Sequence, residues 1–319
     1  MQYLVSSRFR GALLGAALGE ILGANYQNRI DAKLSTCWLE VEQWGFASVN
    51  QIGWGQLAID TLDRLVQNQP VLAQDAILNQ FETEPPLAGW AIATLPIALF
   101  HHDDPDKLRF HLEQAIGKLP ASASALGALI VGYTLSLALR EQFHPHSLIP
   151  RLQTDLEIKS HHPRLAHQLN QVQTWMAQTV GITAVKSLLR DNPVDPVDDL
   201  TPIALALYSF LSTPTEARLS ILRAIQLQYQ PPVTGAIAGA LSGAYRSFTG
   251  LPLNWRRGLG QFSSAFPLSQ LWSLPSEADL LHYADRLWAV WSGAANPADW
   301  LQHPHFHTIT ASPHLIRPC

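Results

Sequence analysis

The sequence predicts an all-α protein built as a single compact domain, and three observations support this class. Apolar residues recur at helical spacing along most of the 319 residues. No series of alternating apolar and polar residues indicates strands, and the proline-rich stretches are too short to be linkers. Hydrophobic residues make up 47% of the chain and charged residues 14%. This balance requires a large core, or a surface that a partner partly covers.

The first half of the chain predicts five helices. In chain order these are 9–24, 56–67, 88–100, 105–116 and 120–140. Pro96 is expected to kink the third helix, because proline lacks a backbone N–H. Asp104 precedes Pro105 and is expected to cap the fourth helix.

The second half predicts further helices separated by short polar stretches. Residues 144–179 are expected to hold two helices, and 192–197 a proline-rich loop. Asp198 or Asp199 is expected to cap a helix over 200–211, Thr213 the helix after it, and Ser276 a last helix to residue 293. A small-residue helix is expected over 234–248. We therefore expect a helical domain over residues 1–295 and a Pro- and His-rich tail over 296–319.

Charge and cysteine content exclude several classes of protein. The net charge is −4, and no run of Lys or Arg would follow a phosphate backbone, so no nucleic-acid partner is expected. The charge-free stretch 121–139 has the length of a bilayer span, but its small residues favour a buried helix. Glu20 interrupts the apolar run near the N-terminus, which argues against a signal peptide. Two distant cysteines, Cys37 and Cys319, favour a reducing, cytoplasmic setting.

The first predicted helix carries a glycine at every fourth position. It reads RFRGALLGAALGEILGANYQ, with glycines from Gly11 to Gly23 on one face, where a neighbouring helix can approach closely. This segment resembles the opening motif of the ADP-ribosylglycohydrolase superfamily, Gly-x-x-x-Gly-x-x-x-Gly-Asp-Ala-Leu-Gly. That superfamily includes the dinitrogenase-reductase-activating glycohydrolases.

A second match lies more than 200 residues later, in the order that the family requires. Residues 234–245 read TGAIAGALSGAY and are similar to the end of the family's final signature, Asp-x-Asp-Thr-x-Gly-Ala-Ile-Ala-Gly-Ala-Leu-Ala-Gly-Ala-Tyr. Gly250-Leu251-Pro252 and Trp255 also agree, and Pro96 matches a proline of a middle segment. The resemblance covers most of the chain up to about residue 257. It implies an all-α fold and hydrolysis of ADP-ribosyl bonds with two magnesium or manganese ions.

The chain departs from the family where the family binds metal. The late Asp-x-Asp-Thr motif aligns with Gln230-Pro231-Pro232-Val233, and the early Thr-Asp-Asp-Thr motif falls near Trp54, in WGQLA. Magnesium and manganese require carboxylate oxygens, and neither stretch supplies one. The sequence therefore predicts no metal site and no cofactor.

Two acidic residues remain as candidate catalytic groups. Glu20 replaces the Asp of the first motif, and Asp60 lies one helical turn beyond the early motif. A lone carboxylate in an apolar cleft can act as a general acid or base, but a capped, structural carboxylate is the favoured interpretation. Residues that could line a retained ligand cleft are Asn25, Tyr26, Gln27, Gln56, Tyr229 and Gln230.

Histidine clusters offer a weaker metal hypothesis. His101-His102-Asp103-Asp104 is best interpreted as a helix end followed by a capping Asp. The pair His161-His162 and the tail residues His303, His305, His307 and His314 do not predict one coherent site.

Three hypotheses of function follow. The favoured one is a family member without the dimetal site that acts as a binding, scaffold or assembly factor for a protein partner. The second is a reader that binds ADP-ribose or a nucleotide without turnover. The third is an ADP-ribosyl hydrolase with a changed site, in which Glu20 or Asp60 serves as general acid or base.

Overall fold

The structure is a computed structural model that describes residues 3–31, 53–71, 87–116, 123–191, 200–260 and 267–294. All regular structure within these ranges is helical, which confirms the predicted class. The α-helices are α1 (Val5–Asp31), α2 (Trp54–Val66), α4 (Trp90–Ala93), α5 (Leu95–Phe100), α6 (Pro105–Ala115), α7 (Ala123–Leu139), α8 (Leu148–Asp155), α9 (Ile158–His161), α10 (Pro163–Ala177), α11 (Ile182–Asp191), α12 (Thr201–Ser212), α13 (Ala217–Gln226), α14 (Pro231–Arg246), α15 (Leu253–Gly260), α16 (Pro267–Trp272) and α17 (Glu277–Ser292). Short 3-10 turns, η2 (Leu87–Gly89) and η4 (Phe248–Gly250), precede α4 and follow α14.

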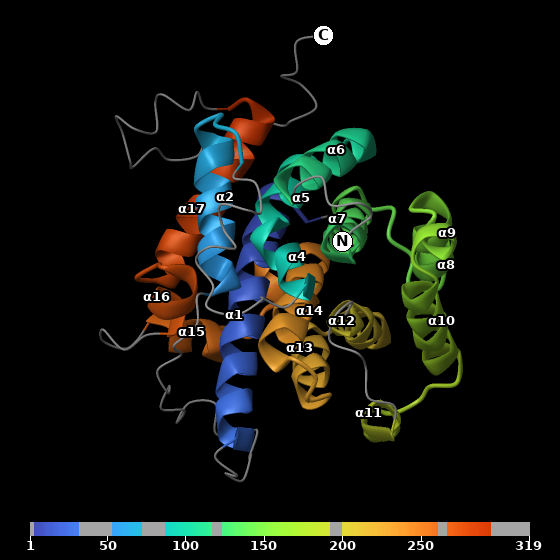
Figure 1. Cartoon of the computed structure of the whole chain (residues 1–319). Helices are drawn as coiled ribbons and strands as arrows, with labels where there is room; N and C mark the ends of the chain where they lie inside the picture. The colour runs from blue at the N-terminus through green and yellow to red at the C-terminus, as the bar shows by residue number, and fades with distance from the viewer. Residues whose placement is uncertain are drawn as a thin grey trace.

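Helices α1 and α14 form the centre of the fold and lie side by side in antiparallel directions (Figure 1). Their contact is made by glycines: Gly11 faces Gly243, Gly15 faces Gly239 and Gly19 faces Gly235. A Cβ atom built on Gly15 would lie 2.1 Å from the carbonyl oxygen of Gly239. The two backbones are therefore in direct contact, as the four-residue glycine spacing predicts.

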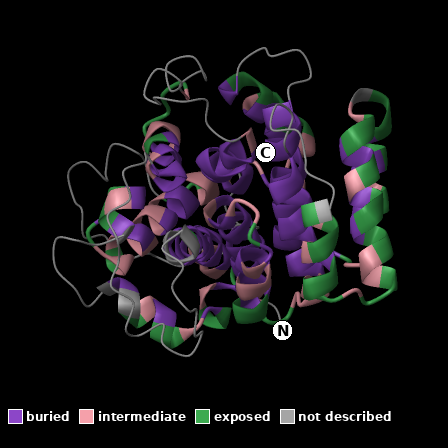
Figure 2. Cartoon of the chain, turned by 60° about the horizontal axis from the view of Figure 1, so that its bottom comes forward, coloured by how far each residue is buried: buried purple, intermediate pink, exposed green. Residues whose placement is uncertain are grey.

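The core is continuous around this pair, whereas the outer helices bury one face each (Figure 2). Helix α7 carries no charge and is buried along almost its whole length, as expected for a central helix. Within the described residues, no helix combines the length and the apolar character that crossing a membrane requires. The charge-free stretch is thus accounted for as core.

Helix α17 covers α1 and α2 and is tied to both by ion pairs. Arg10 of α1 donates two hydrogen bonds to Asp285, at 2.6 and 2.7 Å. Arg286 donates to Asp63 of α2 at 3.1 Å, and the hydroxyl of Tyr283 donates to the same carboxylate at 3.3 Å. These contacts fix the C-terminal part of the described chain against its N-terminal part.

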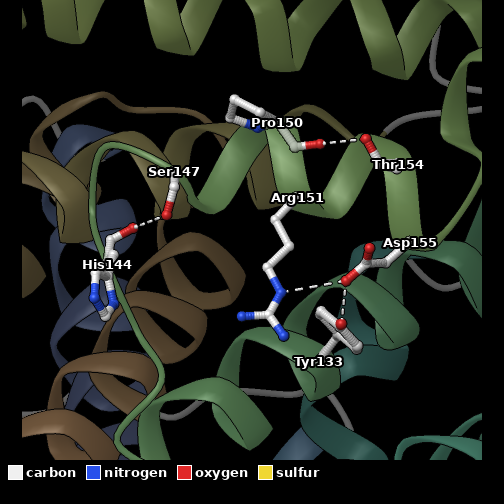
Figure 3. Close-up of polar contacts among 7 residues, drawn as sticks. All are labelled: Tyr133, His144, Ser147, Pro150, Arg151, Thr154 and Asp155. Atoms are coloured by element: carbon white, nitrogen blue, oxygen red, sulfur yellow. Dashed lines mark hydrogen bonds and ion pairs between the residues drawn. The ribbon is translucent and has the colours of Figure 1, made fainter.

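Helices α8 to α10 lie at one side of the molecule (Figure 1). Asp155, at the end of α8, accepts hydrogen bonds from the hydroxyl of Tyr133 on α7 and, at 3.3 Å, from Nε of Arg151 (Figure 3). Gln153 donates to Asn170 of α10 at 2.9 Å. These polar contacts connect α8 to α7 and to α10.

Several predicted boundaries are correct. Asp104 accepts a hydrogen bond from the backbone N–H of Lys107 and caps α6, and Ser276 caps α17 through the N–H of Asp279. The predicted helix over 88–100 is interrupted at Thr94, two residues before Pro96, and so divides into α4 and α5. The expected caps Asp198 and Asp199, the loop 192–197 and the tail 296–319 lie outside the described residues.

Other boundaries differ from the prediction. Thr213 ends α12 instead of capping the next helix, because its hydroxyl bonds back to the carbonyl of Ser209; α13 begins only at Ala217. Three helices, α8, α9 and α10, occupy the segment where two were expected, since Glu157 takes a left-handed conformation before Ile158. Helices α11, α15 and α16 were not predicted, because short amphipathic segments give little periodic signal.

Candidate functional site

The candidate site lies where the start of α2 meets the middle of α1. The backbone N–H of Trp54, the first residue of α2, donates a hydrogen bond of 3.0 Å to Oε1 of Glu20. Gly53 stands at the N-cap of α2 and has no side chain with which to cap it. Glu20 therefore supplies, from another helix, the acceptor that a capping residue normally provides.

Trp272 of α16 closes this junction from the other side. Its indole ring lies against Gly55, so that a Cβ atom on Gly55 would approach the ring atoms to 2.2 Å. Trp272 is fully buried, and Glu20 is only 2% exposed. The C-terminal segment of the described chain thus fills the space above the first turn of α2.

The carboxyl group of Glu20 is held in an apolar interior. Burial raises the pKa of Glu20 to about 7, opposed by the N–H of Trp54, the indole N–H of Trp272 and the N–H of Gly55. Oε2 of Glu20 and Nε1 of Trp272 each make no hydrogen bond of good geometry, although the indole is close enough to lower this pKa. Among the described residues, no charged side chain contributes to the shift, and none of them is a counter-ion to this carboxyl.

A second polar group lies at the end of α1 nearest the start of α14, where Gly23 packs on Pro231. The side-chain amide of Gln228 donates to the hydroxyl of Tyr26 at 3.0 Å. Asn25 is 6% exposed, and within the described part of the chain its Nδ2 atom makes no hydrogen bond. Tyr26 and Gln228 therefore form a polar contact between α1 and the α13–α14 loop.

The α13–α14 loop keeps an unusual backbone. Gln228 and Gln230 adopt positive φ angles of 58° and 41°, a region that favours glycine. The carbonyl of Tyr229 between them accepts a hydrogen bond of 2.6 Å from the hydroxyl of Thr234. Gln230 is the N-cap residue of α14 but makes no side-chain cap.

The predicted site residues divide into two groups. Glu20, Asn25, Tyr26, Tyr229 and Gln230 lie along α1 and at the start of α14. Asp60 is exposed in the middle of α2, where desolvation and Asp63 raise its pKa and Arg64 opposes them. Gln27 is also exposed, and Gln56 is half-buried in the first turn of α2.

Sequence reasoning missed two residues of the junction. Trp272 lies beyond the part of the chain that the family resemblance covers, and no local pattern predicts its contact with Gly55. Gln228 and Tyr229 align with two glycines that directly precede the family's late Asp-x-Asp-Thr motif. The positive φ at Gln228 is therefore a feature that these glycines in the family signature could have predicted.

The residues at the two motif positions do not fit a pair of divalent ions. Trp54, Gly55 and Leu57 offer no side-chain oxygen, and Pro231 and Pro232 begin α14. Glu20, the carboxylate at this junction, is already bonded to α2. Among the described residues, no group of three or more His, Cys, Asp and Glu is arranged to hold a metal ion. We therefore derive no chemical step through metal ions.

The fold and this junction define an all-helical protein in which two central helices are in contact through glycines and the candidate site lies beside the middle of the first of them. The chain belongs to the ADP-ribosylglycohydrolase family, whose model matches residues 58–297. No curated protein matches the chain.

One solved structure similar to the chain is described as an ADP-ribosylglycohydrolase-related protein complex. It is 18% identical, with a TM-score of 0.48, and the alignment covers 90% of this chain and 99% of that one.

Proposed function

We propose that this protein is a family member without hydrolase activity that acts as a binding, scaffold or assembly factor for a protein partner. The observation that carries the proposal is the use of Glu20: its carboxyl caps α2, and the indole of Trp272 covers it. While α16 covers it, a group enclosed in this way does not reach a substrate. We also propose that the protein uses no metal cofactor and works in the cytoplasm.

The donor chemistry supports the same proposal. Two adjacent divalent ions bring four positive charges together, and they require several carboxylates to offset their repulsion. Gln230 offers only an amide oxygen, and Val233 offers none. Asp60 is exposed on α2, beyond the first turn where the early motif would lie. The loss thus affects both halves of the metal site.

An activity assay tests this proposal directly. Proteins or peptides carrying ADP-ribose on different side chains would be incubated with the pure chain, with and without Mg²⁺ or Mn²⁺. We expect no release of ADP-ribose above the rate without protein. Metal-dependent release would refute the proposal. Metal-independent release that Glu20→Gln abolishes would support a hydrolase with a changed site, because a carboxyl with a pKa near 7 suits a general acid.

A reader of ADP-ribose is the second candidate, and one observation favours it. The amide Nδ2 of Asn25 is buried and makes no hydrogen bond to the described residues, so it is a donor that a ligand oxygen could accept from. Calorimetric titration with ADP-ribose, with and without magnesium, separates the candidates. Binding without metal that Asn25→Ala weakens supports a reader. If millimolar ADP-ribose produces no heat of binding, the reader hypothesis is excluded and the scaffold role remains.

A further inference from the structure

The short helix α16 rests on the first turn of α2 through two glycines. A Cβ atom on Gly53 would lie 2.0 Å from the carbonyl oxygen of Leu271, and one on Gly55 would meet the ring of Trp272. Leu268, Leu271 and Trp272 are all buried. Helix α16 is therefore the cover that separates Glu20 from solvent on this side.

No charge balances Glu20 from any of the helices packed around it. Glu20 is the one titratable residue of α1 between residues 11 and 25, and α14 has none between 231 and 244. Helix α16 has none either. On α2, Asp60 is exposed, Asp63 is bonded to Arg286, and neither affects the pKa of Glu20.

The protonated and ionised forms of a buried carboxyl differ greatly in free energy in these surroundings. The neutral acid tolerates an apolar site, whereas the carboxylate requires hydrogen bonds or water for both oxygens. Here Oε1 accepts from Trp54, but Oε2 has no hydrogen bond of good geometry. Water would satisfy Oε2, and the indole of Trp272 is the described side chain that borders this carboxyl, so its movement would open a path for water.

We propose that α16 is a latch on α2, closed while Glu20 is protonated and released when Glu20 loses its proton. Release would expose the first turn of α2 and the indole of Trp272, and so would change the surface available to a partner. The latch does not depend on whether the protein hydrolyses ADP-ribosyl bonds, because it rests on the packing of α1, α2 and α16 alone.

Hydrogen exchange of the full chain, followed by mass spectrometry and corrected for the intrinsic effect of pH, tests the latch. A carboxyl that titrates near pH 7 when closed and near 4.5 when open favours opening about tenfold more at pH 8 than at pH 6. We therefore expect peptides covering 267–274 to lose protection about tenfold over this range. Peptides of α12, which lies away from this junction, should stay protected.

Two variants separate the latch from general loosening of the fold. Glu20→Gln keeps an oxygen that accepts from Trp54 but cannot ionise, so protection of 267–274 should no longer depend on pH. Trp272→Phe keeps an aromatic ring at this position but removes the indole N–H. It should therefore retain the pH dependence and shift the transition to higher pH, because one group that lowers the pKa of Glu20 is lost.

Three results would overturn the latch. These are equal protection of 267–274 at pH 6 and pH 8 in the natural chain, an unchanged pH dependence in Glu20→Gln, and a loss of protection shared equally by α12. If Glu20→Gln does not fold, carbon-13 NMR of the Glu20 carboxyl decides the question in the natural chain. A midpoint near 7 that coincides with the pH at which peptides covering 267–274 lose protection supports the latch, and a midpoint that differs from this pH excludes it.

Discussion

The carbonyl oxygen of Gly239 occupies the position next to Gly15 that any side chain would need. A Cβ atom on Gly15 would lie 2.1 Å from this oxygen, and a Cβ atom on Gly239 would lie 2.0 Å from the carbonyl oxygen of Gly15. Each glycine therefore makes room for the backbone of the other. The contact between α1 and α14 depends on both.

Gly15→Ala is expected to destabilise the protein by about 3 kcal/mol, because the two helices must separate to admit the methyl group. Chemical denaturation at pH 7 measures the change in the free energy of unfolding. Gly181→Ala is the matched control, since a Cβ atom there meets nothing within 4 Å. It should cost about 1 kcal/mol or less, because Gly181 only precedes α11 and the added methyl group meets nothing. Equal effects of the two substitutions would show that α1 and α14 are not in backbone contact.

The junction between α2 and α16 predicts a coupled pair of substitutions. Gly55→Ala places a methyl group 2.2 Å from the indole of Trp272, which must then leave its buried position. We expect a loss of about 2 to 3 kcal/mol of stability. Trp272→Leu alone should also destabilise, because it leaves a cavity.

The double variant distinguishes direct contact from independent effects. A smaller residue at 272 makes room for the new methyl group, so the combined loss should be about 1 kcal/mol or more below the sum of the single losses. Unfolding of all four proteins of the cycle in urea measures this difference. Additive losses would mean that Trp272 does not rest on Gly55.

The stacked imidazoles of His101 and His111 predict how stability changes in acid. Their ring centroids lie 4.1 Å apart with an angle of 7° between the planes. Burial, followed by the charge of His111, lowers the pKa of His101 to about 4 from an ordinary value of 6.5. Between pH 6.5 and 4 the unfolded chain therefore binds a proton that the folded chain does not.

The sign of the effect follows from this difference in bound protons. The contribution of His101 lowers stability as the pH drops from about 6.5 to 4, whereas Glu20, with its raised pKa, acts in the opposite direction. The test is therefore a comparison with the natural chain: between pH 7 and pH 4, His101→Asn should lose about 1 to 2 kcal/mol less stability. Urea denaturation at pH 7, 5.5 and 4 measures it. His167→Asn, at an exposed position on α10, should leave the fall unchanged. An equally steep fall in both variants would contradict the assignment to His101.

Much of the fold could be predicted because the spacing of glycines within each helix indicates the central contact between α1 and α14. The glycines from Gly11 to Gly23 and from Gly235 to Gly243 mark one face of each helix, and this face is the one in contact. The uncharged stretch of α7 likewise indicated burial on all sides. Patterns of this kind depend only on helix geometry, so they can be recognised in the sequence without knowing which helices pack against them.

The site could be predicted only in part, because its contacts join distant segments. Glu20 and Gln230 were found through their register with family motifs, whereas Trp272 reaches Glu20 from more than 250 residues away. Helix α16 has six residues, too few for a period to be recognised. To predict that Glu20 caps α2, one would also need to know that Gly53, which has no side chain to accept a hydrogen bond, is the N-cap residue of this helix.

The backbone of the α13–α14 loop gives the last prediction. Gln230 has φ 41° and ψ 60°, and a left-handed conformation costs a residue with a side chain about 1 to 2 kcal/mol. Gln230→Gly removes this cost but makes the unfolded chain more flexible, so we expect a net gain of about 0.5 to 1 kcal/mol. Thermal and urea denaturation measure the gain.

Two further variants separate relief of backbone strain from loss of the Gln230 side chain. Thr179→Gly, at an exposed residue with φ 51°, should stabilise to a similar degree, whereas Gln230→Ala should bring no gain because alanine keeps the strain. A gain in Gln230→Ala would assign the effect to the side chain instead. A gain in stability in the glycine variants alone would mean that the loop keeps a backbone conformation suited to glycine. The loop would keep it although Gln230 and Pro232 replace the two carboxylates that follow the glycines in the family motif.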